Sequence, residues 1–441
     1  MSKFFAHPPS ATKNPLTSGT FANASATKAK AAGVEAKRFL TDAAGLANPK
    51  HSISVAALLI AALPGLARAQ WIVTELNPGG PGFSRGQAAS GGVQGGYKYV
   101  GNQIHGGIWN STSNSFLDLN PAGFTQSEVL TIYGGIQGGR AIVNGSGQAG
   151  LWTGTAISWR NLQPAGIGES AVLALNGTQQ GGLGRVVPDW RPHALLWRGT
   201  AASCVDLNPA GAYSSSVRAI SDGHQYGYAE MGNGYHAGMW SGTAASWVDL
   251  SPLGTSNSFL FGAHDGQQVG YVNIGFTNTL IHACIWSGTA ASWIDIHPPG
   301  ASESKAYGIG AGIQVGHTGA PEFRHACLWR GTASSYLDLS QFLPAGFRDS
   351  IAMAVSSDSI NTYVVGSARD RFGQTSALVW IKPHVPPCYA DFNGDTTVDF
   401  FDYIDFVSAF SSDSSSADFN HDTVIDLYDY LEFVQAFSTG C

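Results

Sequence analysis

His282–Pro298, with the sequence HACIWSGTAASWIDIHP, is the stretch of this 441-residue chain that decides its fold. The pattern recurs as HALLWRGTAASCVDLNP at His193–Pro209 and as HAGMWSGTAASWVDLSP at His236–Pro252. A weaker copy, QAGLWTGTAISWRNLQP, covers Gln148–Pro164. Because repeats of roughly 20–50 residues are typical of solenoids and propellers, the repeat has to be interpreted before any single residue.

Each repeat predicts four short antiparallel strands, the arrangement of a propeller blade. The third strand begins HAxxW, the fourth has the pattern WVDL, and the turn SGTAAS joins them. The third-strand tryptophans recur at intervals of 43 to 51 residues: Trp109, Trp152, Trp197, Trp240, Trp286, Trp329 and Trp380. The sequence therefore predicts an all-β fold, a seven-bladed β-propeller of four-stranded blades over residues 70–383, with these tryptophans packed between blades.

The last blade lacks a fourth strand of its own, because Trp380 is followed by a Pro-rich stretch. At the other end of the repeats, Trp71–Asn77 resembles a fourth strand that no third strand precedes. We therefore expect this N-terminal strand to pair with Ala377–Trp380 and close the ring, which would leave no free sheet edge.

A histidine and an aspartate stand 13 residues apart in five repeats, as in His236 and Asp249. In the second repeat, Gln148 and Asn161 replace both members together. Paired replacement predicts mutual hydrogen bonding across the hairpin, in a buried setting. A metal or acid–base site is the alternative, although catalysis needs one distinguished site rather than five copies.

The repeat resembles the HAF family of extracellular repeats, named for the His-Ala-Phe start of the third strand. The resemblance covers residues 97–380 and departs from the family by placing Gly, Leu, Cys or Ile where Phe is favoured. It implies an exported repeat protein and supplies neither a substrate nor a catalytic residue.

Export is also predicted by the N-terminal segment. The apolar run Val55–Leu63 follows Lys50 and His51, and Ala67–Ala69 has a small-x-small cleavage pattern. We interpret residues 1–69 as a disordered N-terminus plus a signal peptide, with an uncleaved anchor as the alternative, and expect no transmembrane span after cleavage. A formal charge of -7 excludes an extended nucleic-acid interface, because neutralising phosphates requires clustered Lys and Arg.

The connections between second and third strands vary most, so we expect a ligand to bind on their face of the propeller. Aromatic rings with polar neighbours suit sugar rings or exposed peptides, although packing of each aromatic onto the next blade is the alternative. The candidate ligand-binding residues are Trp190, Arg191, Tyr235, Phe276, Phe323, Arg324 and Phe372.

Two cysteines, Cys388 and Cys441, bracket the C-terminal segment, which in an exported protein suggests a disulfide. We interpret Cys204, Cys284 and Cys327 as apolar core residues, because equivalent positions in neighbouring blades lie too far apart to bridge.

The C-terminal segment follows a Pro-rich linker at 384–387 and has two calcium-loop patterns. Asp391–Asp402 reads DFNGDTTVDFFD, and Asp418–Asp429 reads DFNHDTVIDLYD, shifted by 27 residues throughout. Oxygen-bearing side chains at positions 1, 3, 5, 9 and 12 match an EF-hand-type loop and predict two Ca²⁺ ions. An apolar stripe after each loop, such as Ile404, Val407 and Phe410, predicts a helix.

Residues 388–441 thus resemble a type I dockerin, a small helical module folded around calcium. By position, the resemblance implies as calcium ligands Asp391, Asn393, Asp395, Thr397, Asp399, Asp402, Asp418, Asn420, Asp422, Val424, Asp426 and Asp429. Its partner would be a cohesin-like or cell-surface protein. Bulky residues at loop positions 10 and 11, Phe400 and Phe401, depart from cohesin-binding dockerins and leave surface attachment open.

These features together predict a secreted or cell-surface, non-enzymatic binding or adhesion protein. Its propeller would recognise a glycan or peptide, and its C-terminal module would dock to a partner. The alternative is a dockerin-bearing carbohydrate-active enzyme, which would need a distinguished acid–base pair of carboxyl groups.

Overall fold

The structure is a computed structural model that describes residues 71–78, 82–232, 234–275, 280–384, 388–395, 397–419 and 424–439. The predicted disordered segment and signal peptide, residues 1–69, lie outside this part of the chain, as do linker residues 385–387. Among the described residues, no helix is long and apolar enough to cross a membrane.

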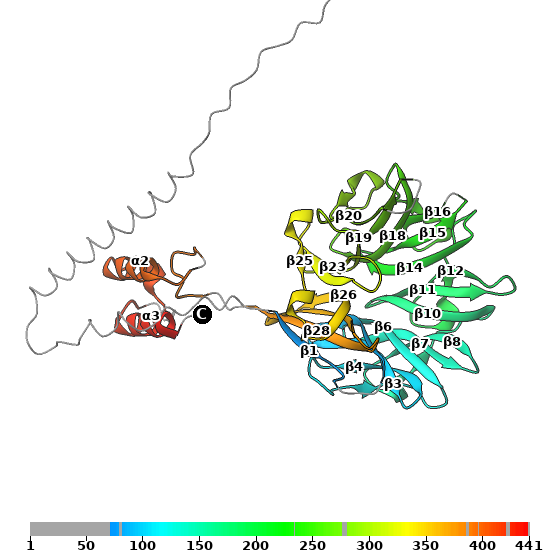
Figure 1. Ribbon diagram of the computed structural model, residues 1–441, viewed down its shortest axis with the longest axis horizontal. Coiled ribbons are helices and arrows are strands. Elements are labelled where there is room, and N and C mark those ends of the chain that lie inside the picture. The colour runs from blue at the N-terminus through cyan, green and yellow to red at the C-terminus, as the bar shows by residue number, and fades with distance from the viewer. Residues whose placement is uncertain are drawn as a thin grey trace, which may run out of the picture. The chain divides into compact units, whose positions relative to one another are not determined.

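Seven antiparallel sheets of four strands each form a β-propeller, which confirms the predicted fold class (Figure 1). The first three blades are β2 (Ser84–Ser90), β3 (Val93–Val100), β4 (Gln103–Trp109) and β5 (Leu117–Asp118); β6 (Gln126–Tyr133), β7 (Ile136–Val143), β8 (Ser146–Trp152) and β9 (Arg160–Asn161); and β10 (Ile167–Asn176), β11 (Gln179–Val186), β12 (Arg191–Trp197) and β13 (Val205–Asp206). The next three are β14 (Ser214–Ser221), β15 (His224–Met231), β16 (Gly234–Trp240) and β17 (Val248–Asp249); β18 (Thr255–His264), β19 (Gln267–Ile274), β20 (Leu280–Trp286) and β21 (Ile294–Asp295); and β22 (Ser304–Gly310), β23 (Ile313–Thr318), β24 (His325–Trp329) and β25 (Leu337–Asp338).

The seventh blade joins the two ends of the propeller. It consists of β26 (Phe347–Ser357), β27 (Asn361–Asp370), β28 (Thr375–Pro383) and the N-terminal β1 (Ile72–Glu75). Figure 1 shows β1 in blue beside β28 in orange. In this antiparallel pair, Val73 lies opposite Trp380. The pairing continues past β1, where the Leu76 amide donates to the Ala377 carbonyl at 3.0 Å. The predicted ring closure is confirmed.

The third-strand tryptophans fill the spaces between blades. Each is at most 1% exposed. Trp240 of the fourth blade packs against Leu196 and Leu207 of the third, and Trp109 of the first packs against Val379 of the seventh. Since removing a buried tryptophan side chain costs about 3–5 kcal/mol, these contacts are a principal source of stability between blades.

A buried serine in the first strand of each blade forms a second link between blades. The Ser215 hydroxyl accepts from the Ala194 amide of the preceding blade at 2.9 Å, and Ser84 accepts from Ala377 across the ring closure at 2.8 Å. The seven linking serines are Ser84, Ser127, Ser170, Ser215, Ser258, Ser304 and Ser350. Each satisfies a backbone amide that would otherwise be buried without a partner.

The His–Asp pairs form the predicted hydrogen bonds, with Nδ1 to Oδ2 distances of 2.6 to 2.9 Å. In the second blade, Asn161 Nδ2 donates to Gln148 Oε1 at 2.6 Å. The expectation that the pairs are buried is wrong, because the aspartates are 29% to 49% exposed. The other oxygen of Asp249 accepts from the Ser251 amide at 2.8 Å, so the aspartate fixes the end of the fourth strand.

Two helices, α2 (Phe400–Ser411) and α3 (Leu427–Thr439), follow the two loops near the C-terminus, as predicted. Their fully buried contact is the stacked pair Phe406 and Phe433, with ring centroids 3.9 Å apart. The predicted apolar stripe is wrong at its first position, because Ile404 and Leu431 are 44% and 51% exposed. In each helix, the face turned to its neighbour begins one residue earlier than the stripe.

Candidate functional site

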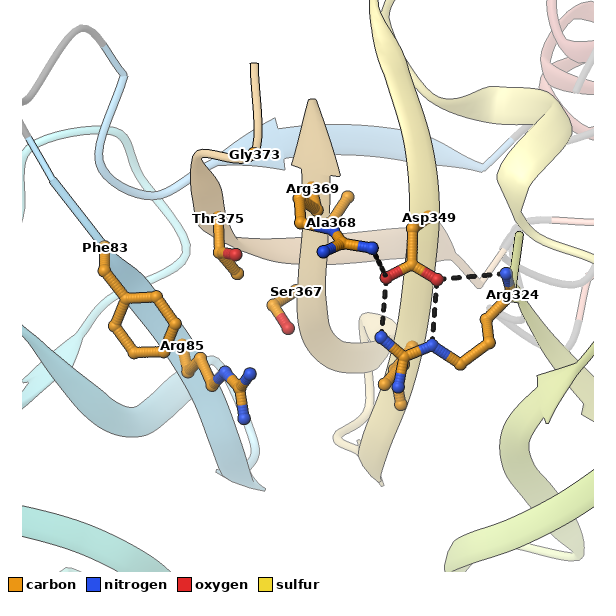
Figure 2. Close-up of a pocket in the computed structure, with 10 residues that line it drawn as sticks. Phe83, Arg85, Arg324, Asp349, Ser367, Ala368, Arg369, Gly373 and Thr375 are labelled. Carbon is orange, nitrogen blue, oxygen red and sulfur yellow. Dashed lines mark hydrogen bonds and ion pairs between the residues drawn. The ribbon is translucent and has the colours of Figure 1, made fainter. Parts of the chain in front are cut away.

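A pocket of about 210 Å³ lies between the first, sixth and seventh blades (Figure 2). Alternate connections of an antiparallel sheet lie at opposite ends of its strands, and this pocket opens at the end with the connections between second and third strands. It is lined by Phe83, Arg85, Arg324, Asp349, Ile351, Ser367, Ala368, Arg369, Gly373 and Thr375.

Asp349 is the buried carboxylate of this pocket. Its side chain is 4% exposed. Arg324 binds it with two guanidinium nitrogens, Nε at 2.8 Å from Oδ1 and Nη2 at 2.6 Å from Oδ2, and donates its backbone amide to Oδ1 at 3.0 Å. Arg369 Nη2 lies 3.7 Å from Oδ2 and 3.2 Å from Glu322 Oε1. Asp349 therefore holds Arg324 directly, whereas Arg369 lies closer to Glu322 than to Asp349.

Asp349 is ionised at neutral pH. Burial raises the pKa of its carboxyl, but the hydrogen bonds and charge of Arg324, together with the charge of Arg369, outweigh burial and hold the pKa below its ordinary value. In the sixth blade, the hydrogen bond with His317 lowers the pKa of Glu303. A glycosidase-type general acid needs a carboxyl with a raised pKa, and neither group provides one.

Arg85 lies on the opposite side of the pocket, and Figure 2 shows Ser367 and Thr375 between it and Asp349. Its guanidinium carbon is 4.8 Å from the centroid of the Phe83 ring. The residue is exposed, and no carboxylate in the described part of the chain forms an ion pair with it. Three guanidinium groups and one buried carboxylate thus line the pocket, which leaves its lining positively charged.

The structure places one of the predicted ligand-binding residues, Arg324, in this pocket. Phe323 and Phe372, which are 68% and 74% exposed, adjoin the lining residues Arg324 and Gly373 in sequence. Phe276 lies outside the described residues.

The other three predicted residues lie in the third and fourth blades. Trp190 is 49% exposed and covers the backbone of Gly168. The Arg191 guanidinium carbon lies 4.2 Å from the centroid of the Tyr213 ring. Tyr235 belongs to β16 and is half-buried among aromatic rings, 5.1 Å from Phe259.

The prediction missed Arg85, Asp349 and Arg369, although a signal for them exists in the sequence. Asp349 immediately precedes the linking Ser350, and Phe83 occupies the equivalent place before Ser84. This position lies at or near the start of the first strand of each blade, on the same face as the variable connections. Because this position lies at a strand start rather than in a variable connection, the prediction from the connections did not include it.

The central channel is a second cavity, of about 290 Å³, lined by first-strand residues from all seven blades. Among these lining residues, Arg218 is the charged one, with its guanidinium carbon 5.2 Å from the Phe261 ring centroid. Arg218 Nη2 donates to the Tyr228 hydroxyl at 3.2 Å. The channel therefore has one charged lining side chain, whereas the pocket beside Asp349 has four.

Two of the three propeller cysteines are buried core residues, as predicted, whereas Cys204 is partly buried and packs against the edge of a core cluster. Cys284 and Cys327 are fully buried and free, and burial raises the pKa of both thiols. Cys388 is disulfide-bonded. Its predicted partner, Cys441, lies outside the described residues, so the pairing itself stays a prediction.

The first calcium-loop pattern folds its oxygen atoms inward. Asp391 Oδ1 and Asn393 Oδ1 both accept from the Asp395 amide, at 3.0 and 2.9 Å. Asp402 is fully buried and accepts from the Asn393 and Asp399 amides at 3.0 and 2.8 Å. Among the described residues, no three His, Cys, Asp or Glu side chains converge as a metal site.

The second pattern repeats part of this geometry. Asp429 is fully buried and accepts from the Asp426 amide at 2.8 Å, as Asp402 does from Asp399. Asn420 and Asp422 lie outside the described residues. No lysine or arginine follows Lys382 in the sequence, so side chains of this module supply no such cation to its buried carboxylates.

Neither a protein-family model nor a curated protein matches the sequence. The structure is similar to puromycin hydrolase, at 12% identity and a TM-score of 0.43 over 68% of this chain and 52% of that one. It is also similar to Pyrococcus horikoshii acylaminoacyl peptidase (10% identity, TM-score 0.44, 71% and 53% covered). A third similar structure is Trypanosoma rangeli sialidase in complex with the inhibitor DANA (10%, 0.36, 60% and 56%). The chain spans about half the length of these proteins, and similarity at this level carries no functional argument.

Proposed function

We propose that this protein is an exported, non-enzymatic binding protein. Its propeller binds a ligand on the face that carries the connections between second and third strands, and its C-terminal module attaches it to a partner or a cell surface. The observation that supports this best is the pocket around Asp349, which has fixed guanidinium groups and an ionised carboxylate but no second carboxyl group among its lining residues. Such an arrangement suits recognition better than acid–base hydrolysis.

The HAF-type repeats and the predicted signal peptide support export. The C-terminal module supports attachment through its resemblance to type I dockerins. Two calcium ions fit this module, because calcium is bound by carboxylate and amide oxygens of the kind that its loops supply. Asp391, Asn393, Asp395, Thr397, Asp399 and Asp402 would hold one ion, and the residues 27 positions later would hold the other. Bound calcium would neutralise carboxylates that repel one another in its absence.

The binding proposal is tested by incubating the full chain with immobilised polysaccharides and cell-wall peptides, measuring both retention and released sugar or peptide. Retention without release is the expected result. Release of product by the propeller would overturn the proposal in favour of the carbohydrate-active enzyme, or of a peptidase if peptides are cleaved.

The calcium proposal is tested by calorimetric titration of the full chain with Ca²⁺, which should show two bound ions. Asp391→Ala should remove one ion, because the first loop position is a direct ligand. Asp405→Ala, which removes an exposed carboxylate from α2, should leave both ions bound. Equal loss in both variants would mean that calcium responds only to the overall charge of the module.

A further inference from the structure

We propose that the pocket around Asp349 binds the carboxylate of an acidic sugar, such as a uronic acid residue of a polysaccharide. This inference rests on the proposed binding function and assigns its ligand class. The residues that would hold the sugar are Arg85 and Arg369 at the carboxylate, Ser367 and Thr375 at hydroxyl groups, and Phe83 as an aromatic wall.

The charges of the pocket favour an anion. Two arginines on this face have a carboxylate within their own blade: Arg140 has Glu128 at 2.8 Å, and Arg185 has Glu169 at 3.4 Å. In the first blade, Phe83 stands at the place that Asp349 occupies in the seventh. Arg85 therefore presents a guanidinium without an ion-pair partner in the described part of the chain. The Arg85 guanidinium also hydrogen-bonds Tyr97, but it has five N–H donors and can bind a carboxylate through two parallel hydrogen bonds.

Arg324 and Arg369 contribute to this preference differently. Arg324 is occupied by both oxygens of Asp349, so it positions Asp349 rather than the ligand. Arg369 lies farther from Asp349, at 3.7 Å, and its other carboxylate contact, Glu322, is 71% exposed. A ligand carboxylate can therefore replace Glu322 at Arg369 at little cost, because exposed ion pairs contribute little free energy.

The walls of the pocket favour a sugar over an acidic peptide. Ser367 and Thr375 are buried residues, each 9% exposed, and their hydroxyls have no side-chain hydrogen-bond partner among the described residues. Sugar hydroxyls would supply those partners. The backbone of β27 is paired on both sides, with β26 and β28, so it offers no strand edge to a peptide.

The test measures binding of a galacturonic acid trisaccharide and its methyl ester to the full chain at fixed calcium concentration. The ester keeps the sugar rings and removes the charge, so the acid should bind at least about tenfold more tightly. Arg85→Gln should weaken binding of the acid about 10- to 100-fold, and added salt should weaken it in the parent protein. Arg348→Gln, at an exposed arginine that does not line the pocket, is the matched control and should bind like the parent.

Three results would overturn the inference. They are equal binding of acid and ester, equal loss in the Arg85→Gln and Arg348→Gln variants, and tight binding of a triglutamate peptide instead of uronate trisaccharides. If a neutral glycan is retained in the wider screen while no uronate binds, the proposed binding function stands and the acidic-sugar assignment fails. If nothing is retained in either assay, the proposed function itself fails.

Discussion

Ring closure through the N-terminal strand makes a sharp prediction at Leu76. This residue is fully buried and packs in one cluster with Trp109, Ala377 and Val379. Replacing it by alanine removes contacts on both sides of the junction between the first and seventh blades. If the ring closes as described, the Leu76→Ala variant should lose as much stability as a core substitution in the middle of the propeller.

The size of the effect follows from burial. A fully buried Leu→Ala substitution costs about 2–5 kcal/mol. For a propeller of about 310 residues, the unfolding entropy is roughly 0.65 kcal/mol/K, so the melting temperature should fall by about 3–8 °C. The matched control is Leu250→Ala, because Leu250 is also fully buried and holds the same place after the fourth strand of the fourth blade.

The assay is thermal unfolding of the full chain, followed by near-UV circular dichroism of the buried tryptophans. A second control, Leu253→Ala, replaces a fully exposed leucine four residues after the end of β17 and should melt like the parent. The closure is refuted if Leu76→Ala melts like Leu253→Ala while Leu250→Ala is destabilised, since the N-terminal strand would then contribute nothing to the ring.

Three further predictions concern single sites. Trp190→Ala should change stability by about 1 kcal/mol or less in urea unfolding, because the ring is 49% exposed, and a larger loss would make it a core residue. Burial lowers the pKa of His317 below 6.5, so as the pH falls the imidazole is protonated in the unfolded chain before it is protonated in the folded one. The free energy of unfolding should therefore fall as the pH drops from about 6.5 toward the lower folded pKa. A parent-like dependence of stability on pH in His317→Gln would contradict this. Each of the single variants His236→Gln and Asp249→Asn should lose roughly 0.5–1 kcal/mol of unfolding free energy, and the double variant should recover part of that loss, because the second blade has an amide pair at these places. Losses that simply add would show that the two residues are not coupled.

The fold was predictable because the repeat specifies it seven times over. The spacing of the third-strand tryptophans set the number of blades, and the unpaired strand at Trp71–Asn77 set the closure. The linking serines were not predicted, although Ser215 and its equivalents recur in every blade. A serine before a short apolar run has many uses, and only the structure shows its hydroxyl reaching the Ala194 amide of another blade.

The candidate site was less predictable, because it is assembled from residues far apart in the sequence. Arg85 and Asp349 are 264 positions apart and approach through the ring closure. Of the residues predicted from the variable connections, Arg324 lines the pocket. Tyr235 was also predicted to bind a ligand, yet its ring is half-buried against Phe259. The sequence alone does not distinguish an exposed ring from a packed one.

The position of the pocket gives ligand binding a mechanical consequence. Phe83 and Arg85 belong to the first blade, whereas Asp349 and Thr375 belong to the seventh, which the N-terminal strand completes. A ligand held between these blades adds its binding free energy to the stability of the closed ring, by about 2.7 kcal/mol when its concentration is 100 times Kd. A saturating ligand should therefore offset a large part of the loss in Leu76→Ala, provided that the weakened closure still forms the pocket. The departures from the repeat, rather than the repeat itself, thus mark where we propose that this propeller binds its ligand.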